Sequence, residues 1–227
     1  MKITATVEPQ YQFHVDMKKQ FGLVQLGIEK SGAWRLDPRR LVFCLSRYKF
    51  VAKMLSGSNR VLELGCGDGW PLPIVLQEVK QVHGVDIDPV FIQDALERLE
   101  PKSPCSFAVH DILTGPVTPK FDAVFSLDVL EHIAPGEDEK KFMCNLIDSM
   151  VDKGVAIIGM PSLESQQYAS PASKAGHINC KKGPDLKVFL GNYFDHVFIF
   201  SMNDEVVHSG YHPMAQYLFA LCTGAKR

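Results

Sequence analysis

The sequence lacks several signatures that would place a protein in a class at once. No run of 18 apolar residues occurs in its 227 residues, and the first twelve residues have no apolar stretch typical of a signal peptide. The net charge of -2 leaves no excess of basic residues for a nucleic-acid surface. None of the six cysteines lies three residues from another, which excludes zinc-ribbon and thioredoxin-like pairs. We therefore expect a cytoplasmic protein with reduced cysteines, no membrane span and no nucleic-acid partner.

From about residue 60 onward, short apolar segments with strand character alternate with amphipathic segments that have helix character. We predict strands at residues 60–64, 81–87, 105–110, 121–127, 154–160, 196–202 and 216–222. We predict helices between most of these strands, at residues 71–79, 89–99, 137–151 and 183–194. Strands that are separated by helices pair in parallel, and the crossover helices cover both faces of the sheet.

Both ends of the chain depart from this alternation. Residues 203–215 join the last two predicted strands without a helix, which favours antiparallel pairing there. Before residue 60 the pattern is helical, most clearly at residues 37–55. The sequence therefore predicts an α/β, Rossmann-like, doubly wound sheet of seven strands, mostly parallel with an antiparallel last strand. We expect one compact unit, with an N-terminal helical appendage at residues 1–58 and the main domain at 59–227. The appendage either packs on the sheet or covers a substrate.

The segment VLELGCGDGWP, residues 61–71, predicts a ligand-binding loop. A buried strand ends in closely spaced glycines, which allow a ligand to lie against the main chain. A helix follows, so unpaired N–H groups point at the loop. Gly65 and Gly67 match the start of a dinucleotide fingerprint, but Trp70 occupies the place of its third glycine and Gly69 comes one residue early. No Gly-Lys-Ser/Thr follows, which excludes a P-loop.

Two aspartates follow the next two predicted strands. Asp86 lies about twenty residues after the loop, where an acidic residue meets ribose hydroxyls in Rossmann-type folds. Asp111 follows the third strand and can accept from the amino group of an adenine. Either residue can instead be structural, Asp86 as a surface carboxylate at a strand end and Asp111 as a turn aspartate.

The ordered set VLELGCGDG, VHGVDID, VHDIL, FDAVFSLDVLEHI and GVAIIGMPS resembles the class I S-adenosylmethionine-dependent methyltransferases. The resemblance covers residues 60 to 162, and SLDVLEHI is similar to the branch of small-molecule O-methyltransferases that act in quinone biosynthesis. It implies S-adenosyl-L-methionine as cofactor and S-adenosyl-L-homocysteine as product.

The resemblance also implies cofactor-binding roles for eight residues. Gly65 and Gly67 lie against the methionine part of the cofactor, and Glu63 supports their loop. The other implied contacts are to the ribose by Asp86, to the adenine by Ile87, Asp111 and Ile112, and to the amino-acid moiety by Leu127.

Methyl transfer to a hydroxyl needs a proton acceptor, and histidine titrates near neutral pH. His132 follows the fourth predicted strand, and His177 lies in the polar segment 161–182, which is either a functional lid or disordered. We expect these two histidines to be catalytic. His208 and His212 lie in a polar cluster whose spacing matches no standard metal site, so we predict no metal.

The sequence thus favours an enzyme that transfers a methyl group from S-adenosylmethionine to a small molecule. The expected acceptor is a hydroxyl oxygen of a sugar-containing or a phenolic, quinone-like metabolite. Two alternatives stay open, an NAD-dependent Rossmann oxidoreductase and a cofactor-binding protein without catalysis. The acceptor and the oligomeric state are not encoded in any motif that we identify.

Overall fold

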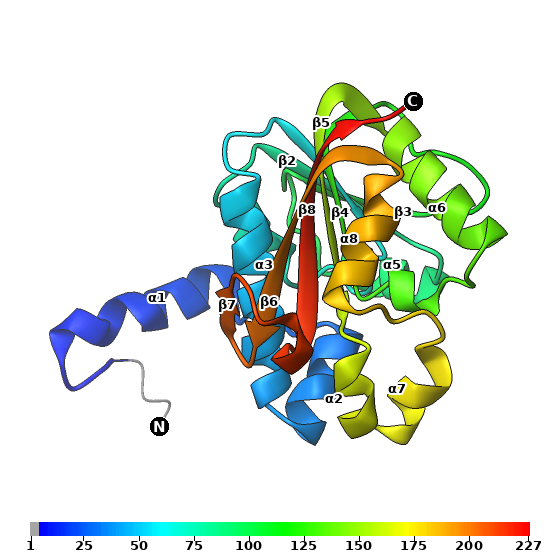
Figure 1. Ribbon diagram of the computed structural model, residues 1–227. Helices are drawn as coiled ribbons and strands as arrows, with labels where there is room; N and C mark the ends of the chain where they lie inside the picture. The colour runs from blue at the N-terminus through cyan, green and yellow to red at the C-terminus, as the bar shows by residue number, and fades with distance from the viewer. Residues whose placement is uncertain (1–4) are drawn as a thin grey trace.

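A single twisted sheet runs through the centre of the computed structural model, which describes residues 5–227 (Figure 1). Its strand order is β3-β2-β1-β4-β5-β8-β6-β7. The strands are β1 (Arg60–Leu64), β2 (Gln81–Asp86), β3 (Cys105–Val109), β4 (Phe121–Leu127), β5 (Met150–Pro161), β6 (Phe194–Asn203), β7 (Val206–His208) and β8 (Tyr217–Ala225). Strands β1 to β5 pair in parallel, whereas β8 is antiparallel to both of its neighbours, β5 and β6.

The sheet has eight strands, so the predicted count of seven is wrong. The additional strand is β7, a three-residue segment that pairs antiparallel with the end of β6. Three residues are too few to show the alternation that marks a strand in sequence. The mostly parallel sheet with an antiparallel end is confirmed. Strand β5 begins at Met150, inside a predicted helix, because Met150 pairs with Phe121 at the start of β4.

Helices cover both faces of the sheet. They are α1 (Gln12–Phe21), α2 (Ile28–Leu36), α3 (Arg39–Met54), α4 (Leu72–Val75), α5 (Pro89–Glu97), α6 (Glu137–Asp148), α7 (Pro171–Gly176) and α8 (Gly183–Gly191). Four 3-10 turns complete the chain, η1 (Pro9–Tyr11), η2 (Leu130–His132), η3 (Glu164–Tyr168) and η4 (His212–Met214). No helix in residues 5–227 is long and apolar enough to cross a membrane.

The two core clusters follow from the alternation of side chains along each strand. In β1, Leu62 packs on the face covered by α6 and α8, while Val61 packs on the face covered by α3 and α4. Both faces are buried, which is why the parallel strands are apolar almost without interruption.

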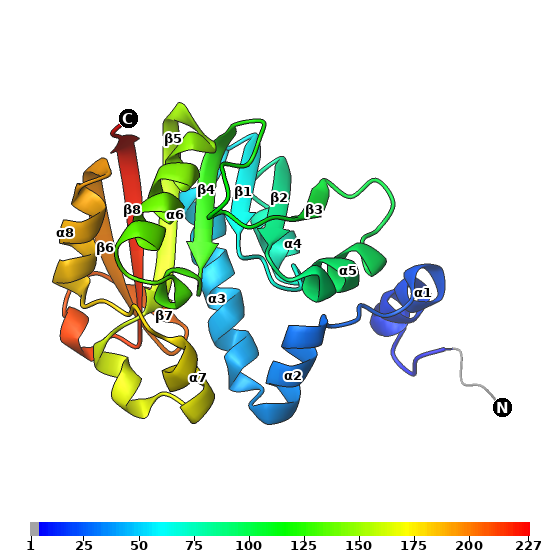
Figure 2. The same ribbon diagram turned by 90° about the vertical axis from the view of Figure 1, so that its right-hand side faces the viewer.

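The N-terminal helices differ in how they relate to this core. Helix α3 begins next to Asp37-Pro38, as predicted, and buries Tyr48, Val51 and Leu55 against the sheet. Helix α1 has no buried residue and extends away from the body (Figures 1 and 2). Helix α3 thus packs on the sheet, which is one of the two roles left open for this region. The first four residues of the predicted appendage lie outside the described part of the chain.

Candidate active site

The carboxyl ends of β1, β2 and β4 meet at one edge of the sheet, where the glycine-rich loop begins. Gly65, Gly67 and Gly69 have φ angles of +76°, +52° and +62°, a region that side chains disfavour. A Cβ atom on Gly65 would lie 2.2 Å from Cγ2 of Val129, so the loop also needs glycine for space. The main chain is thereby free to approach a ligand closely.

Asp86 ties this loop to the end of β2. Its Oδ2 accepts a hydrogen bond of 2.8 Å from the N–H of Gly67, and its Oδ1 accepts one of 2.9 Å from the N–H of Asp88. The carboxylate is half-buried, and each oxygen keeps one lone pair for a further donor. Next to it, the side chain of Ile87 is 66% exposed. Loop and carboxylate meet as the sequence predicts, in a form that suits a ribose diol with an apolar ring beside it.

Asp111 follows β3, the neighbour of β2, so it lies on the same side of the site as Asp86. Its Oδ1 accepts 2.9 Å from the N–H of Leu113, which is the turn role that the sequence left open. Ile112 is buried in the core against α6. Leu127 is also buried, at the end of β4.

Glu63 is fully buried in β1, where the hydroxyl of Tyr48 from α3 donates to its Oε1 at 2.6 Å. Its Oε2 is buried without a hydrogen-bond partner among the described residues. Burial raises the pKa of this carboxyl to about 8, although the Tyr48 bond and the Lys30 ammonium act in the opposite direction. A carboxyl with one unused acceptor beside the loop suits a polar or cationic ligand.

Residues from α2 also reach the loop, which the sequence analysis did not identify. The fully buried Asp68 accepts at Oδ2 from the N–H of Lys30 and at Oδ1 from the N–H of Trp70, at 3.0 and 3.1 Å. The ammonium of Lys30 pairs with Glu29 at 2.7 Å. No local pattern predicts the contact between Lys30 and Asp68, because it joins segments 38 residues apart.

The end of β4 carries a second charged pair. Asp128 has a φ of +57°, and its Oδ2 lies 2.6 Å from Nη1 of Arg47 on α3. The same guanidinium lies over the ring of Tyr217, 3.8 Å from its centroid. Its Nε and the hydroxyl of Tyr217 are both buried without a hydrogen-bond partner in the described chain. Arg47 and Tyr217 are thus further site residues that the sequence analysis did not identify.

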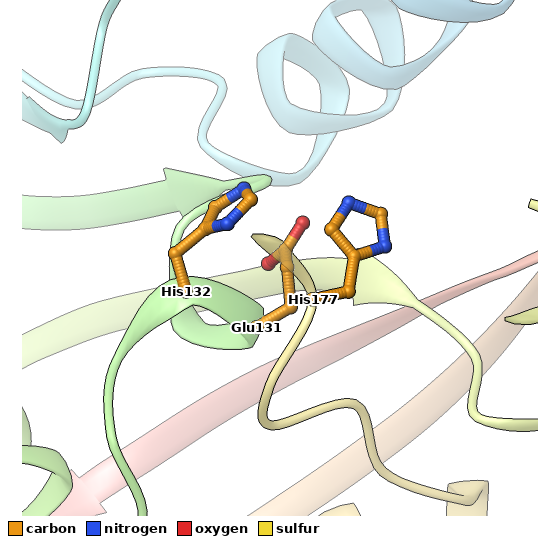
Figure 3. Close-up of side chains that lie close together, drawn as sticks. All are labelled: Glu131, His132 and His177. Atoms are coloured by element: carbon orange, nitrogen blue, oxygen red, sulfur yellow. The ribbon is translucent and has the colours of Figure 1, made fainter. Parts of the chain in front are cut away.

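The structure brings together the two histidines that the sequence predicts to be catalytic (Figure 3). The ring centroids of His132 and His177 are 5.2 Å apart. Nδ1 of His132 lies 2.9 Å from the carbonyl oxygen of Gly176, and Nδ1 of His177 lies 2.8 Å from Oε1 of Gln166. These oxygens only accept hydrogen bonds, so each Nδ1 carries a proton and each Nε2 keeps its lone pair in the neutral ring.

Glu131 lies between the two imidazoles in Figure 3 and is fully buried. Both of its carboxylate oxygens lack a hydrogen-bond partner among residues 5–227. Burial, followed by the charge of Asp128, raises the pKa of Glu131 well above its usual range. One potential ligand atom from each of Glu131, His132 and His177 lies within 4.8 Å of the others.

The polar segment 161–182 is folded rather than disordered. It contains η3 and α7, and it contacts η2 where the N–H groups of Ile178 and Asn179 donate to the carbonyl of Glu131 at 2.8 and 2.9 Å. Figures 1 and 2 both place α7 at the same end of the sheet as α2. The segment therefore forms one wall of the site and delivers His177 to it.

The hairpin histidines have structural partners instead. His208 contacts Oδ1 of Asn203 through Nε2 at 2.9 Å, and His212 contacts the Ser201 hydroxyl through Nδ1 at 2.9 Å. Neither belongs to a group with metal-ligand spacing in the described part of the chain.

Comparison with known proteins identifies the fold and the cofactor. Residues 61–154 match a family model described as a methyltransferase domain. No curated protein matches the sequence. The structure is similar to the N-methyltransferase NodS from Bradyrhizobium japonicum in complex with S-adenosyl-l-homocysteine, with a TM-score of 0.60 and 20% identity over 84% of this chain and 91% of NodS.

Two further solved structures show the same fold. A possible histamine N-methyltransferase from Thermotoga maritima has a TM-score of 0.65 and 14% identity, over 92% of this chain and 98% of its own. The S-adenosylhomocysteine complex of DhpI has a TM-score of 0.60 and 16% identity, over 86% and 88%. Nothing in these matches supports an NAD-dependent oxidoreductase. The glycine loop, the Asp86 carboxylate and the family match agree, and residues 61–154 form an S-adenosylmethionine-dependent methyltransferase domain.

Proposed function

We propose that this methyltransferase methylates a hydroxyl oxygen of a small molecule, such as a sugar or a phenol, and that His132 and His177 accept the hydroxyl proton. The observation that carries this proposal is the state of the two imidazoles. Each donates through Nδ1 to an oxygen acceptor, which leaves one Nε2 lone pair on each of two rings whose centroids are 5.2 Å apart.

The charge state of the rings supports a role as base. Partial burial, with a smaller contribution from His132, lowers the pKa of His177 below its ordinary value. His177 is therefore neutral at pH 7 and ready to take a proton. When bound, S-adenosylmethionine supplies a methyl group whose bond to sulfur breaks with its electron pair left on sulfur, while an oxygen lone pair forms the new C–O bond. The hydroxyl proton passes to Nε2 of one histidine.

The remaining residues hold the cofactor in this proposal. Asp86 accepts from the ribose hydroxyls with the lone pairs that Gly67 and Asp88 leave free. Ile87 offers its exposed side chain to one face of the adenine, and Asp111 receives the adenine amino group. The loop of Gly65 and the end of β4 at Leu127 border the methionine moiety.

Segments from two parts of the chain lie at the same end of the sheet as the site. Segment 161–182 with α7 lies on one side, and α2 lies at the same end of the sheet. An amine is the competing acceptor, because the carboxylate of Asp128 attracts cations and NodS is an N-methyltransferase. An amine that reaches the site already neutral would not need a protein base to accept a proton.

The test is a methyl-transfer screen against matched sets of sugars, phenols and amines, with detection of the methylated product by mass. We expect methylation of a hydroxyl compound, strongly reduced turnover for His132→Ala and His177→Ala at saturating cofactor, and no change for His196→Ala at the opposite end of the sheet. Methylation of amines alone, or full turnover in both site variants, would refute the proposed chemistry. A protein that binds cofactor and methylates no compound would favour a non-catalytic role.

A further inference from the structure

Glu131, His132 and His177 share a property that acid–base chemistry does not explain. One potential ligand atom of each residue lies close to those of the other two. One of the three groups, the buried carboxylate of Glu131, accepts no hydrogen bond from any described residue. We propose that these three residues bind a divalent transition-metal cation. The binding stands on the geometry alone. The role of the metal in methyl transfer rests on the hydroxyl acceptor proposed above, and the metal then replaces the histidines as the group that promotes loss of the hydroxyl proton. The sequence analysis predicted no metal, and its candidate cluster around His208 was a different one.

The spacing suits a shared ion. Metal–ligand bonds of carboxylate oxygen and imidazole nitrogen are about 2.0–2.2 Å, so two ligands of one ion are separated by at most about 4.4 Å. The three atoms in this cluster lie within 4.8 Å of one another. Small side-chain rotations are sufficient to close the remaining gap.

Glu131 gives the strongest indication of a cation site. Its side chain is fully buried, and both carboxylate oxygens lack a donor among the described residues. Leaving such a group without a partner is costly, and buried charges in proteins are normally paired or coordinate metals. The guanidinium of Arg47 is already 2.6 Å from Asp128 and lies over the Tyr217 ring.

Both histidines are oriented as metal ligands usually are. A ligating imidazole generally donates its other N–H to a carbonyl or carboxylate oxygen, which sets the tautomer and the ring orientation. His132 donates to the Gly176 carbonyl and His177 donates to Gln166. The amide of Gln166 is itself held, because its Nε2 donates to the Ser162 carbonyl at 3.1 Å.

The donor set indicates which ion fits. Two imidazole nitrogens and one carboxylate oxygen suit Mn²⁺, Fe²⁺, Co²⁺, Ni²⁺ or Zn²⁺, whereas Mg²⁺ and Ca²⁺ prefer sites made of oxygen. The carboxylate of Asp128 adds negative charge beside Glu131 without being one of the three ligands. Three protein ligands leave coordination positions open for an exogenous group.

An open position beside the transferring methyl group gives the metal a task. A hydroxyl bound there loses its proton more readily, because the cation stabilises the resulting alkoxide or phenolate. The proton then passes to solvent water, and the oxygen lone pair forms the C–O bond as the C–S bond breaks. In the metal-bound enzyme, His132 and His177 are ligands and do not act as the base. The metal-bound reaction therefore depends on the ion, whereas the metal-free reaction depends on a histidine base.

The experiment is a calorimetric titration of the full-length, chelator-treated protein with Mn²⁺, Co²⁺, Zn²⁺ and Mg²⁺, followed by the visible spectrum of the Co²⁺ form. We expect one equivalent of transition metal to bind, more tightly than Mg²⁺, with a spectrum that reports nitrogen and oxygen ligands. Glu131→Gln, His132→Ala and His177→Ala should each weaken binding by on the order of 100-fold. His196→Ala and Glu97→Gln, which change exposed residues outside the site, should leave it unchanged.

The variants need a control for folding, because Glu131 is buried. Circular dichroism and binding of S-adenosylhomocysteine provide it, and His177→Ala serves as the second test because that ring is only partly buried. Absence of binding for all four ions, or binding that the three variants leave unchanged, would overturn the metal site. Full hydroxyl methylation by a metal-free enzyme would refute the metal's catalytic role and leave the proposed function intact. Metal binding without methylation of any hydroxyl would refute the proposed function and leave the metal site intact.

Discussion

Replacing Glu63 by glutamine should change how the stability of the protein depends on pH. Glutamine has the same shape, and its amide oxygen can accept the hydrogen bond that the Tyr48 hydroxyl donates to Oε1 at 2.6 Å. What the substitution removes is a titrating group. Glu63 is fully buried, and burial raises the pKa of its carboxyl from 4.5 to about 8.

The sign and size of the effect follow from linkage. Between pH 4.5 and about 8, the unfolded chain has released the Glu63 proton while the folded chain retains it, so the free energy of unfolding falls as the pH rises. The difference between about 8 and 4.5 is roughly 3.5 units. At about 1.36 kcal/mol per unit, this corresponds to a loss of about 5 kcal/mol, which is an upper bound. That is a large part of the roughly 5–15 kcal/mol that stabilises a typical domain.

Urea denaturation of the wild type and of Glu63→Gln at a series of pH values from 5 to 9 measures this loss. The wild type should lose stability relative to the variant as the pH rises, by several kcal/mol in total. Taking the difference between the two proteins cancels the titration of the other groups, and Glu97→Gln, an exposed carboxyl on α5, should parallel the wild type. A difference between wild type and Glu63→Gln that stays constant within about 0.5 kcal/mol would refute the reasoning.

Three further results follow from the site. Asp86→Asn should weaken S-adenosylhomocysteine binding about 10- to 100-fold in a calorimetric titration, since charge-assisted bonds contribute roughly 1.5–3 kcal/mol. Asp185→Asn is the control. An unchanged affinity of Asp86→Asn would remove Asp86 from the site. Gly65→Ala should lower both the Tm and cofactor affinity, because of its φ of +76° and the approach to Val129. Adding Val129→Ala should recover only part of the lost stability, because the backbone strain of about 1–2 kcal/mol at the positive φ of residue 65 remains. In the metal-free protein the imidazole of His177 should titrate below pH 6.5 by NMR because partial burial lowers its pKa, and a midpoint at or above 6.5 contradicts this.

The hairpin at the end of the sheet shows where sequence patterns stop being informative. The lengths and alternation of the longer strands predict them from local periodicity alone. Strand β7 has three residues, and its existence depends on pairing with the end of β6 rather than on its own pattern. The same applies to segment 161–182, whose polar composition left a lid and disorder equally open. Its fold is settled by bonds to the distant carbonyl of Glu131.

The cofactor half of the site was accessible from sequence because its parts are close along the chain. The glycine loop and Asp86 follow consecutive strands, and parallel pairing of β1 with β2 brings the two strand ends together. The proposed catalytic half depends on contacts across long separations. His132 and His177 are 45 residues apart, Arg47 and Asp128 are 81 apart, and no periodicity encodes either contact. The strand pattern and the closely spaced glycines that follow it predicted a ligand-binding loop, and the family resemblance implied that its ligand is the methyl donor. Only the packing of distant segments decided that a buried, unpaired Glu131 lies between two histidines.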